Sequence, residues 1–141
     1  MDLERLVYVS HATQAFTQEA LDELLAKARD FNRAHGITGL LVYCDPYFAQ
    51  VIEGPRAEIE ALMLSINADP RHRGVFVVDR GPVTERAFEQ WEMGFSRRPR
   101  AELEAIDGFT DFFATNRPPR EASRNARSSI EHLFDMVVRG G

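Results

Sequence analysis

The order in which two hydrophobic periodicities alternate along the chain constrains the fold most. Short apolar runs of β-type composition occur four times, over residues 6–10, 37–43, 47–53 and 75–79. Two longer stretches, with apolar residues three and four positions apart, follow the first and the third of these runs, over residues 17–36 and 55–69. The resulting order, β-α-β-β-α-β, predicts an α+β fold of the ferredoxin-like type, with both helices on one face of a mostly antiparallel sheet.

The ends of both predicted helices carry residues that are typical of helix boundaries. Thr17 is a suitable N-cap, and Gly36 stands where a left-handed residue commonly ends a helix. Pro55 suits the start of the second helix, and residues 69–70, Asp-Pro, end it because the residue before a proline disfavours the helical region. Residues 44–46 are expected to form the short hairpin connection between the second and third strands.

The C-terminal part of the chain has weaker signals. The composition changes at residues 96–100, Ser-Arg-Arg-Pro-Arg, which predicts a boundary between a domain over residues 1–96 and a helical extension over residues 97–141. We expect the extension to pack on the sheet face that the first two helices leave open, or to contact a partner. The elements expected here are a helical turn or two over residues 84–90, a fifth, shorter strand over 91–95, and helices over about 100–114 and 120–138.

The composition predicts a protein class and excludes others. The chain has 141 residues and a formal net charge of -5, with 44% hydrophobic and 28% charged residues, as expected of one soluble globular domain. Neither half is strongly basic, as a nucleic-acid-binding face would be. No apolar run reaches the roughly 18 residues of a membrane span, and the N-terminus lacks a signal-peptide pattern. We therefore expect a cytoplasmic protein with neither nucleic acid nor a membrane as partner.

Metal and cysteine chemistry are not expected either. The four histidines, at positions 11, 35, 72 and 132, lack the spacing of a metal site. Cys44 is the single cysteine, which excludes an intrachain disulfide, and no activating partner for it is evident. We predict no metal site and a small core or loop residue at position 44.

Three polar side chains stand where the periodicity requires apolar ones. Asn32 continues the apolar stripe of the first predicted helix, Gln50 the inward face of the third strand and Tyr8 that of the first. A buried amide or phenol costs roughly 1–3 kcal/mol unless it is hydrogen-bonded. A planar heteroaromatic ligand with carbonyls and nitrogens along one edge would satisfy all three together. Each residue taken alone is also compatible with an ordinary hydrogen-bonded side chain.

Five blocks of sequence, none of them specific alone, form a set with a fixed order and spacing. They are residues 6–10 (LVYVS), 32–41 (NRAHGITGLL), 48–54 (FAQVIEG), 69–73 (DPRHR) and 88–95 (FEQWEMGF). This set, which extends over about two-thirds of the chain, resembles the BLUF family of blue-light sensors that use FAD. The ferredoxin-like fold of that family agrees with the fold that the periodicity predicts.

The resemblance implies a site for the isoalloxazine ring of FAD between the two helices. Leu24 and Ile66 would lie against the faces of the ring, Asn32 would bind its polar edge, and residues 69–72 would lie near the ribityl and phosphate side. The cofactor-binding residues implied in this way are Tyr8, Leu24, Asn32, Phe48, Gln50, Ile66, Asp69, Arg71 and His72. Further cations that could reach a phosphate are Lys27, Arg29 and Arg33.

The resemblance also implies photochemical roles for four residues. Tyr8 would donate an electron to the photoexcited flavin, and Gln50 would bridge Tyr8 and the flavin and relay a proton. Trp91 and Met93 match the pair that the family links to output. We therefore expect a photoreceptor, not an enzyme, which signals to an effector protein or through a change of oligomeric state.

Two departures from the family pattern leave an alternative open. Phe31 stands where many members have a polar residue, and Ser65 stands where some have arginine. The alternative is a flavin-free, ferredoxin-like regulatory domain that acts by binding a partner. A small flavin enzyme is a third interpretation, which the lack of a nicotinamide-binding motif disfavours.

Overall fold

The computed structural model describes residues 2–14, 16–88 and 92–97 of the chain. The elements within these ranges are β1 (Leu3–Ala12), α1 (Gln18–His35), β2 (Thr38–Cys44), β3 (Tyr47–Pro55), α2 (Arg56–Ala68), β4 (His72–Val83) and β5 (Gly94–Arg97). This order confirms the predicted α+β, ferredoxin-like arrangement with an added fifth strand. The neighbouring strands β1 and β4 are longer than the apolar runs from which they were predicted, because backbone pairing continues through their polar ends.

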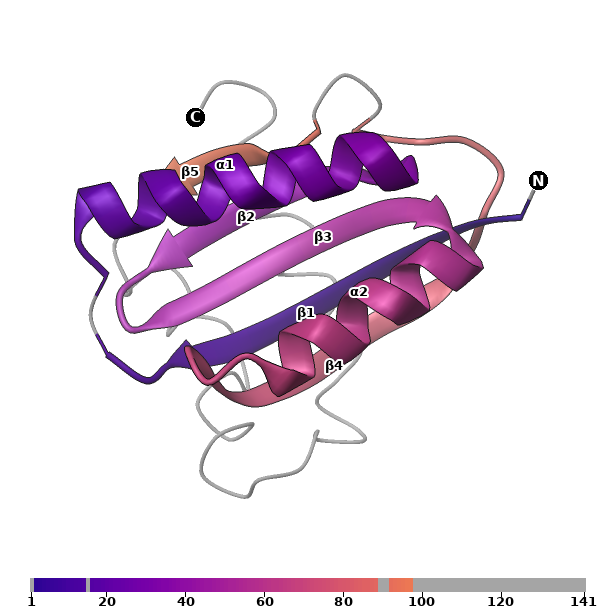
Figure 1. Cartoon of the computed structure of the whole chain (residues 1–141). Helices are drawn as coiled ribbons and strands as arrows, with labels where there is room; N and C mark the ends of the chain where they lie inside the picture. Colours follow the sequence, from indigo (N-terminus) through magenta and orange to yellow (C-terminus); the bar gives the residue numbers. More distant parts are fainter. Residues whose placement is uncertain (1, 15, 89–91, 98–141) are drawn as a thin grey trace.

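The strands form one sheet in the order β4-β1-β3-β2-β5. β1 pairs antiparallel with both β3 and β4, and β2 pairs antiparallel with β3, whereas β5 lies parallel to β2 at the edge. Both helices lie on the same face of this sheet, α1 along β2 and β5 and α2 along β1 and β4 (Figure 1). The central strand β3 therefore runs beneath the space between the helices.

The capping residues explain where α1 begins and ends. The side chain of Thr17 accepts a hydrogen bond of 3.1 Å from the backbone N–H of Ala20, which satisfies one of the free donors of the first turn. Gly36 ends the helix with a φ of 67°, and its N–H donates to the carbonyl of Asn32. Only glycine adopts this left-handed backbone without a steric cost, so the predicted boundary is confirmed.

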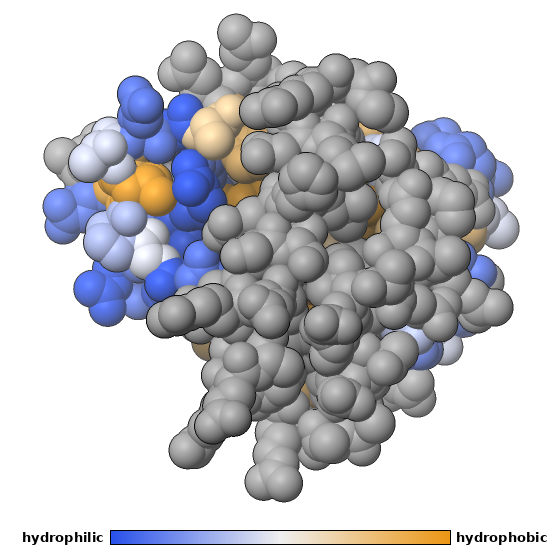
Figure 2. Space-filling model, turned by 180° about the vertical axis from the view of Figure 1, so that it is seen from behind, coloured by the Kyte–Doolittle hydropathy of each residue, from blue (hydrophilic) through white to orange (hydrophobic). Residues whose placement is uncertain are grey.

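The sheet separates two apolar layers because successive side chains of a strand point to opposite faces. Leu6 and Tyr8 of β1 join the layer beneath the helices, while Val7 and Val9 join the layer on the far face. Seen from behind, the described residues that are visible are mostly hydrophilic around a small hydrophobic group (Figure 2). The predicted packing of residues 97–141 on this face lies outside the described residues, apart from Arg97 in β5.

The prediction of helical turns after β4 is wrong for the part that the structure describes. Residues 84–88 form bends and not helix. The N–H groups of Ala87 and Phe88 donate to the carboxylate of Glu53 at 2.8–3.0 Å. A buried acceptor from a distant strand therefore decides the conformation of this loop.

The fifth strand exists but begins later than predicted. Its ladder with β2 starts at the pair Leu40 and Gly94, whereas a strand over residues 91–95 was expected. The carbonyls of Glu92 and Met93 accept hydrogen bonds from side chains of α1. These contacts keep residues 92–93 out of the regular ladder.

Candidate functional site

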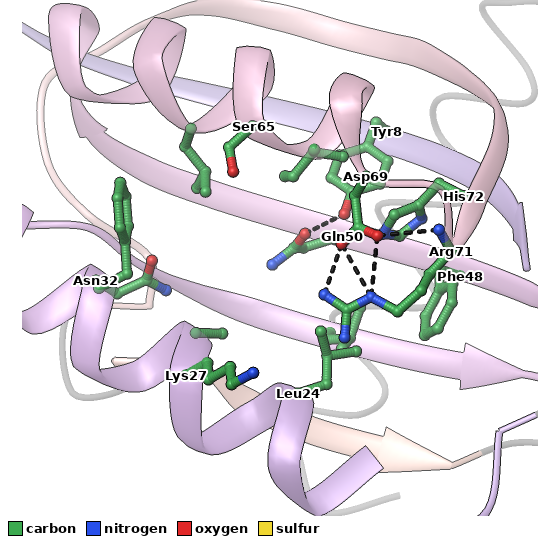
Figure 3. A pocket seen from close by; sticks show the side chains of 15 residues that line it. Tyr8, Leu24, Lys27, Asn32, Phe48, Gln50, Ser65, Asp69, Arg71 and His72 are labelled. Atoms are coloured by element: carbon green, nitrogen blue, oxygen red, sulfur yellow. Dashed lines mark hydrogen bonds and ion pairs between the residues drawn. The ribbon is translucent and has the colours of Figure 1, made fainter. Parts of the chain in front are cut away.

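A cavity of about 280 Å³ lies between α1 and α2 above the sheet. Both helices and the strands β1, β2 and β3 contribute to it, as does the segment that joins α2 to β4 (Figure 3). The side chains that line the cavity are Tyr8, Leu24, Lys27, Ala28, Phe31, Asn32, Leu41, Phe48, Gln50, Leu62, Ser65, Ile66, Asp69, Arg71 and His72. All nine residues that the sequence analysis named as cofactor-binding are among them.

Six lining residues were not named as cofactor-binding. The set consists of Lys27, Ala28, Phe31, Leu41, Leu62 and Ser65. Helical spacing could have identified two of them, since Ala28 is four residues after Leu24 and Leu62 is four residues before Ile66. Leu41 lies opposite Gln50 in the β2–β3 register, which no local pattern shows.

Tyr8 and Gln50 meet because the register of β1 and β3 places them directly opposite each other. The phenolic O–H of Tyr8 donates a hydrogen bond to Oε1 of Gln50, and both residues are buried. The amide nitrogen of Gln50 in turn donates to Sδ of Met93 at 3.3 Å. The three side chains thus form a continuous hydrogen-bonded chain, in which Tyr8 and Gln50 line the cavity and Met93 lies behind them.

The electrostatic surroundings keep the proton on Tyr8. Burial raises the pKa of the Tyr8 phenol far above its usual value, and the negative charge of Asp69 raises it further. The phenol is therefore a hydrogen-bond donor throughout the physiological pH range. Gln50 accepts from Tyr8 with its oxygen, which leaves its amide nitrogen to donate to Met93.

Asn32 closes the far end of the cavity from α1. Its side chain is buried, and its amide nitrogen donates a hydrogen bond of 2.6 Å to the carbonyl of Glu92. In Figure 3 the amide ends of Asn32 and Gln50 both point into the space between the helices. The two amides can therefore act on one edge of a ligand there, while each also donates to the segment Glu92–Met93.

The opposite end of the cavity is charged. The guanidinium of Arg71 forks onto the carboxylate of Asp69, with Nε 3.0 Å from both oxygens, and this pairing lowers the pKa of Asp69. Burial lowers the pKa of His72, whose Nδ1 lies 2.8 Å from Oγ of Ser10. His72 is therefore neutral at physiological pH, and the carboxylate of Asp69 is fully ionised.

The cations of α1 divide into two groups. Lys27 lines the cavity and so remains a candidate for contact with a phosphate. Arg29 and Arg33 instead point to the segment before β5, where they bind the carbonyl of Met93 and the carboxylate of Glu92. Trp91, the other residue expected to take part in output, lies outside the described residues.

A comparison with protein families explains this arrangement. The model of one family, described as "Sensors of blue-light using FAD" and abbreviated BLUF, matches residues 3–94. The chain belongs to the BLUF family. The resemblance seen in the sequence is thereby confirmed, and with it FAD as the cofactor that this family of sensors uses.

Curated relatives share the BLUF region only. Subunit beta of the photoactivated adenylate cyclase of Euglena gracilis is 38% identical over 94 residues, which are 65% of this chain and 11% of that protein. Subunit alpha from the same organism is 38% identical over 93 residues, 64% of this chain and 9% of that protein. The chain thus spans about a tenth of the length of these cyclase subunits.

Solved structures share the fold over longer stretches. The dark-state structure of BlrB, a BLUF protein, matches with a TM-score of 0.67 at 32% identity, over 92% of this chain and 95% of that one. The photo-activated state of BlsA matches with a TM-score of 0.70 at 27% identity, over 94% of each chain. Klebsiella pneumoniae BlrP1 with FMN and cyclic diGMP matches with a TM-score of 0.63 at 31% identity, over 74% of this chain and 27% of that one.

Membrane-spanning helices and metal-binding clusters are absent from the part of the chain that the structure describes. None of the helices there is both long and apolar enough to cross a membrane. In the same ranges, no group of three or more His, Cys, Asp or Glu side chains could hold a metal ion.

Proposed function

We propose that this chain is a blue-light photoreceptor whose photochemistry is carried by Tyr8 and Gln50 beside FAD in the cavity between α1 and α2. The observation that carries the proposal is the buried hydrogen-bonded chain from Tyr8 through Gln50 to Met93. It combines a phenol that can lose an electron and a proton with an amide that can accept a proton at one end and release one at the other.

The chemistry of the lining residues fits FAD. The amides of Asn32 and Gln50 supply both donors and acceptors, as the polar edge of an isoalloxazine ring requires. Leu24 and Ile66, from the two facing helices, supply apolar contacts for the two faces of a planar ring. Lys27 and Arg71 supply positive charge for the ribityl and phosphate part, with Asp69 and His72 beside Arg71.

The photochemical step is confined to the hydrogen-bonded chain. Bound FAD supplies the absorption of blue light and, when excited, an acceptor for one electron. Tyr8 would give up that electron together with its phenolic proton, which would pass to Oε1 of Gln50. Gln50 would in turn pass a proton from its nitrogen to bound FAD, so that one electron and one proton reach the cofactor, and their return by the same path would restore Tyr8. Gln50 is left with a changed tautomer or orientation, and no bond is made or broken permanently.

Output is proposed to leave the domain through the segment that contains Met93. This segment contacts Gln50 on one side and continues into the edge strand β5 on the other. We propose that residues 1–96 form the sensing domain and that residues 97–141 carry the signal to an effector protein or to a second copy in the cytoplasm. The names of the Euglena relatives, which pair light activation with an adenylate cyclase, support an effector that is a separate functional unit.

Absorption spectroscopy of the purified protein tests the proposal. We expect a yellow protein whose flavin band shifts slightly to the red after blue light and returns in the dark. The flavin released by denaturation should be FAD and not FMN, as chromatography against both standards would show. A colourless protein that rejects added FAD would overturn the proposal and favour the flavin-free regulatory domain. Permanent bleaching or steady NADH oxidation would instead indicate a flavin enzyme.

A further inference from the structure

The segment Glu92–Met93 is held to α1 by side chains that the photochemistry does not use. Nε of Arg29 donates to the carbonyl of Met93 at 3.0 Å. The guanidinium of Arg33 donates two hydrogen bonds to the carboxylate of Glu92, from Nε at 2.9 Å and from a terminal nitrogen at 2.8 Å. Together with the bond from Asn32 to the carbonyl of Glu92, these contacts engage both carbonyls and the side chain of the segment.

We propose that Arg29 and Arg33 are positioning residues that hold Met93 against Gln50 by clamping the segment Glu92–Met93 to α1. These two arginines, with Glu92 and the carbonyl of Met93, are called the α1 clamp below. The consequence for light signalling rests on the proposed function. The clamp itself is a property of the fold and can be tested without light.

The position of the segment explains why a clamp is needed there. The ladder between β2 and β5 begins only at Gly94, so residues 92–93 have no strand pairing of their own. Figure 1 shows α1 lying alongside β5, and Arg29 and Arg33 of this helix bind the residues that precede the strand. Side chains of the helix thus replace the missing backbone bonds.

The clamp determines where the side chain of Met93 lies. Met93 is only 2% exposed, and its Sδ accepts from the amide nitrogen of Gln50. The carbonyls on either side of its Cα are both bound to α1, so its backbone cannot rotate freely. Arg29 on the carbonyl of Met93 and Arg33 on the side chain of Glu92 add to the bond from Asn32, so losing either arginine weakens the restraint and leaves the bond between Tyr8 and Gln50 in place.

The strength of the clamp suits a reversible device. Arg33 and Glu92 are 64% and 41% exposed, and exposed pairs contribute little individually. The fork geometry adds directionality, and the pairing lowers the pKa of the Glu92 carboxyl, so that it stays charged. Such a contact shifts the equilibrium between the attached and the detached segment Glu92–Met93 by a few-fold, and both states stay accessible.

Hydrogen exchange and methionine oxidation of the full-length protein in the dark test the clamp. In Arg33→Gln, we expect exchange of the amides of residues 92–97 and oxidation of Met93 by peroxide to speed up by about two- to five-fold. The matched control is Arg56→Gln, which removes an exposed arginine at the start of α2 that pairs with Glu60 and Glu4. Amides of β1 serve as an internal reference for global folding.

Exchanging the charges of Arg33 and Glu92 distinguishes the loss of their ion pair from any other effect of replacing Arg33. The double variant Arg33→Glu with Glu92→Arg should recover most of the protection that each single variant loses.

In the light experiment, we expect Arg33→Gln to slow the dark return of the absorption shift by about two- to five-fold, because it weakens the arrangement to which the protein returns. Unchanged exchange and oxidation in Arg33→Gln, or no recovery in the double variant, would overturn the clamp. A protein without any light-induced shift would overturn the proposed function and leave the dark measurements to decide the clamp.

Discussion

Tyr8 shows how burial prepares a single residue for its proposed task. Its phenol is shut off from water beneath the helices, and burial with the nearby charge of Asp69 raises its pKa. In the proposed step the proton leaves only together with the electron, because an oxidised phenol is a far stronger acid than a neutral one. A tyrosine at the surface would have water as a competing partner in place of the amide of Gln50.

Replacing Tyr8 by phenylalanine tests this role directly. The Tyr8→Phe variant should bind flavin but lose the light-induced red shift, because a phenyl ring has no proton to transfer. Difference spectra before and after blue light measure the loss. Tyr43→Phe is the matched control, since Tyr43 is equally buried but donates to Asp45 and does not line the cavity. A normal photocycle in Tyr8→Phe would remove Tyr8 from the donor role.

At the scale of elements, the close pairing of β2 with β3 carries Gln50 to the middle of the sheet. Gly39 makes this pairing possible, because a Cβ at that position would lie 2.1 Å from the carbonyl oxygen of Val51. No side chain can avoid such a contact with backbone unless the two strands move apart. Gln50 is next to Val51, so a shift of the strands would also move the hydrogen bond between Gln50 and Tyr8.

Alanine at position 39 should therefore damage the fold. We expect Gly39→Ala to lower the free energy of unfolding by about 2–4 kcal/mol, since one of the two strands must move. Urea denaturation followed by circular dichroism measures the change. Gly81→Ala is a suitable comparison, because a Cβ there meets nothing within 4 Å and should change stability by no more than about 0.5 kcal/mol. Equal effects of the two substitutions would contradict the steric argument.

At the scale of the whole molecule, a buried carboxylate joins distant parts of the chain. Glu53 is fully buried, and Arg5 of β1 holds one of its oxygens with two nitrogens at 2.8 and 2.7 Å. The same carboxylate accepts from the backbone of Ala87 and Phe88, in the loop that leads from β4 toward β5. Arg86 ties that loop to the end of α1 through the carbonyl of Gly36. The loop that leads to the segment Glu92–Met93 is thus held by hydrogen bonds on the face of the sheet opposite the cavity.

Removing the charge of Glu53 should loosen this attachment. We expect Glu53→Gln to lower the free energy of unfolding by about 2–4 kcal/mol, because Arg5 loses its buried partner. Amides of residues 84–88 should exchange faster than those of β1 in the folded variant. Glu60→Gln removes an exposed acid with surface ion pairs and should cost less than about 1 kcal/mol. Wild-type stability of Glu53→Gln would show that the carboxylate is dispensable.

The sequence alone was sufficient to predict the order of the helices and strands and to identify the three polar residues that interrupt the apolar pattern of the core. Periodicity, N-caps and a left-handed glycine are local features, and they predicted the helices, the first four strands and the ferredoxin-like class. The mismatch of Tyr8, Asn32 and Gln50 with an apolar pattern was visible without coordinates, as was the set of blocks that resembles the BLUF family. The start of β5 and the bends at residues 84–88 could not be predicted from the sequence, because side chains from other elements decide both.

Tertiary structure alone decided which of these residues meet. Tyr8 and Gln50 are 42 positions apart, and Arg33 and Glu92 are 59 apart, so no local spacing relates them. Their contacts depend on strand register and on the side of the sheet where α1 lies, both of which follow from the packing of the whole domain. The same packing turned Arg29 and Arg33 from candidates for a phosphate into partners of the segment Glu92–Met93, because a long side chain can reach any acceptor that the fold brings near it.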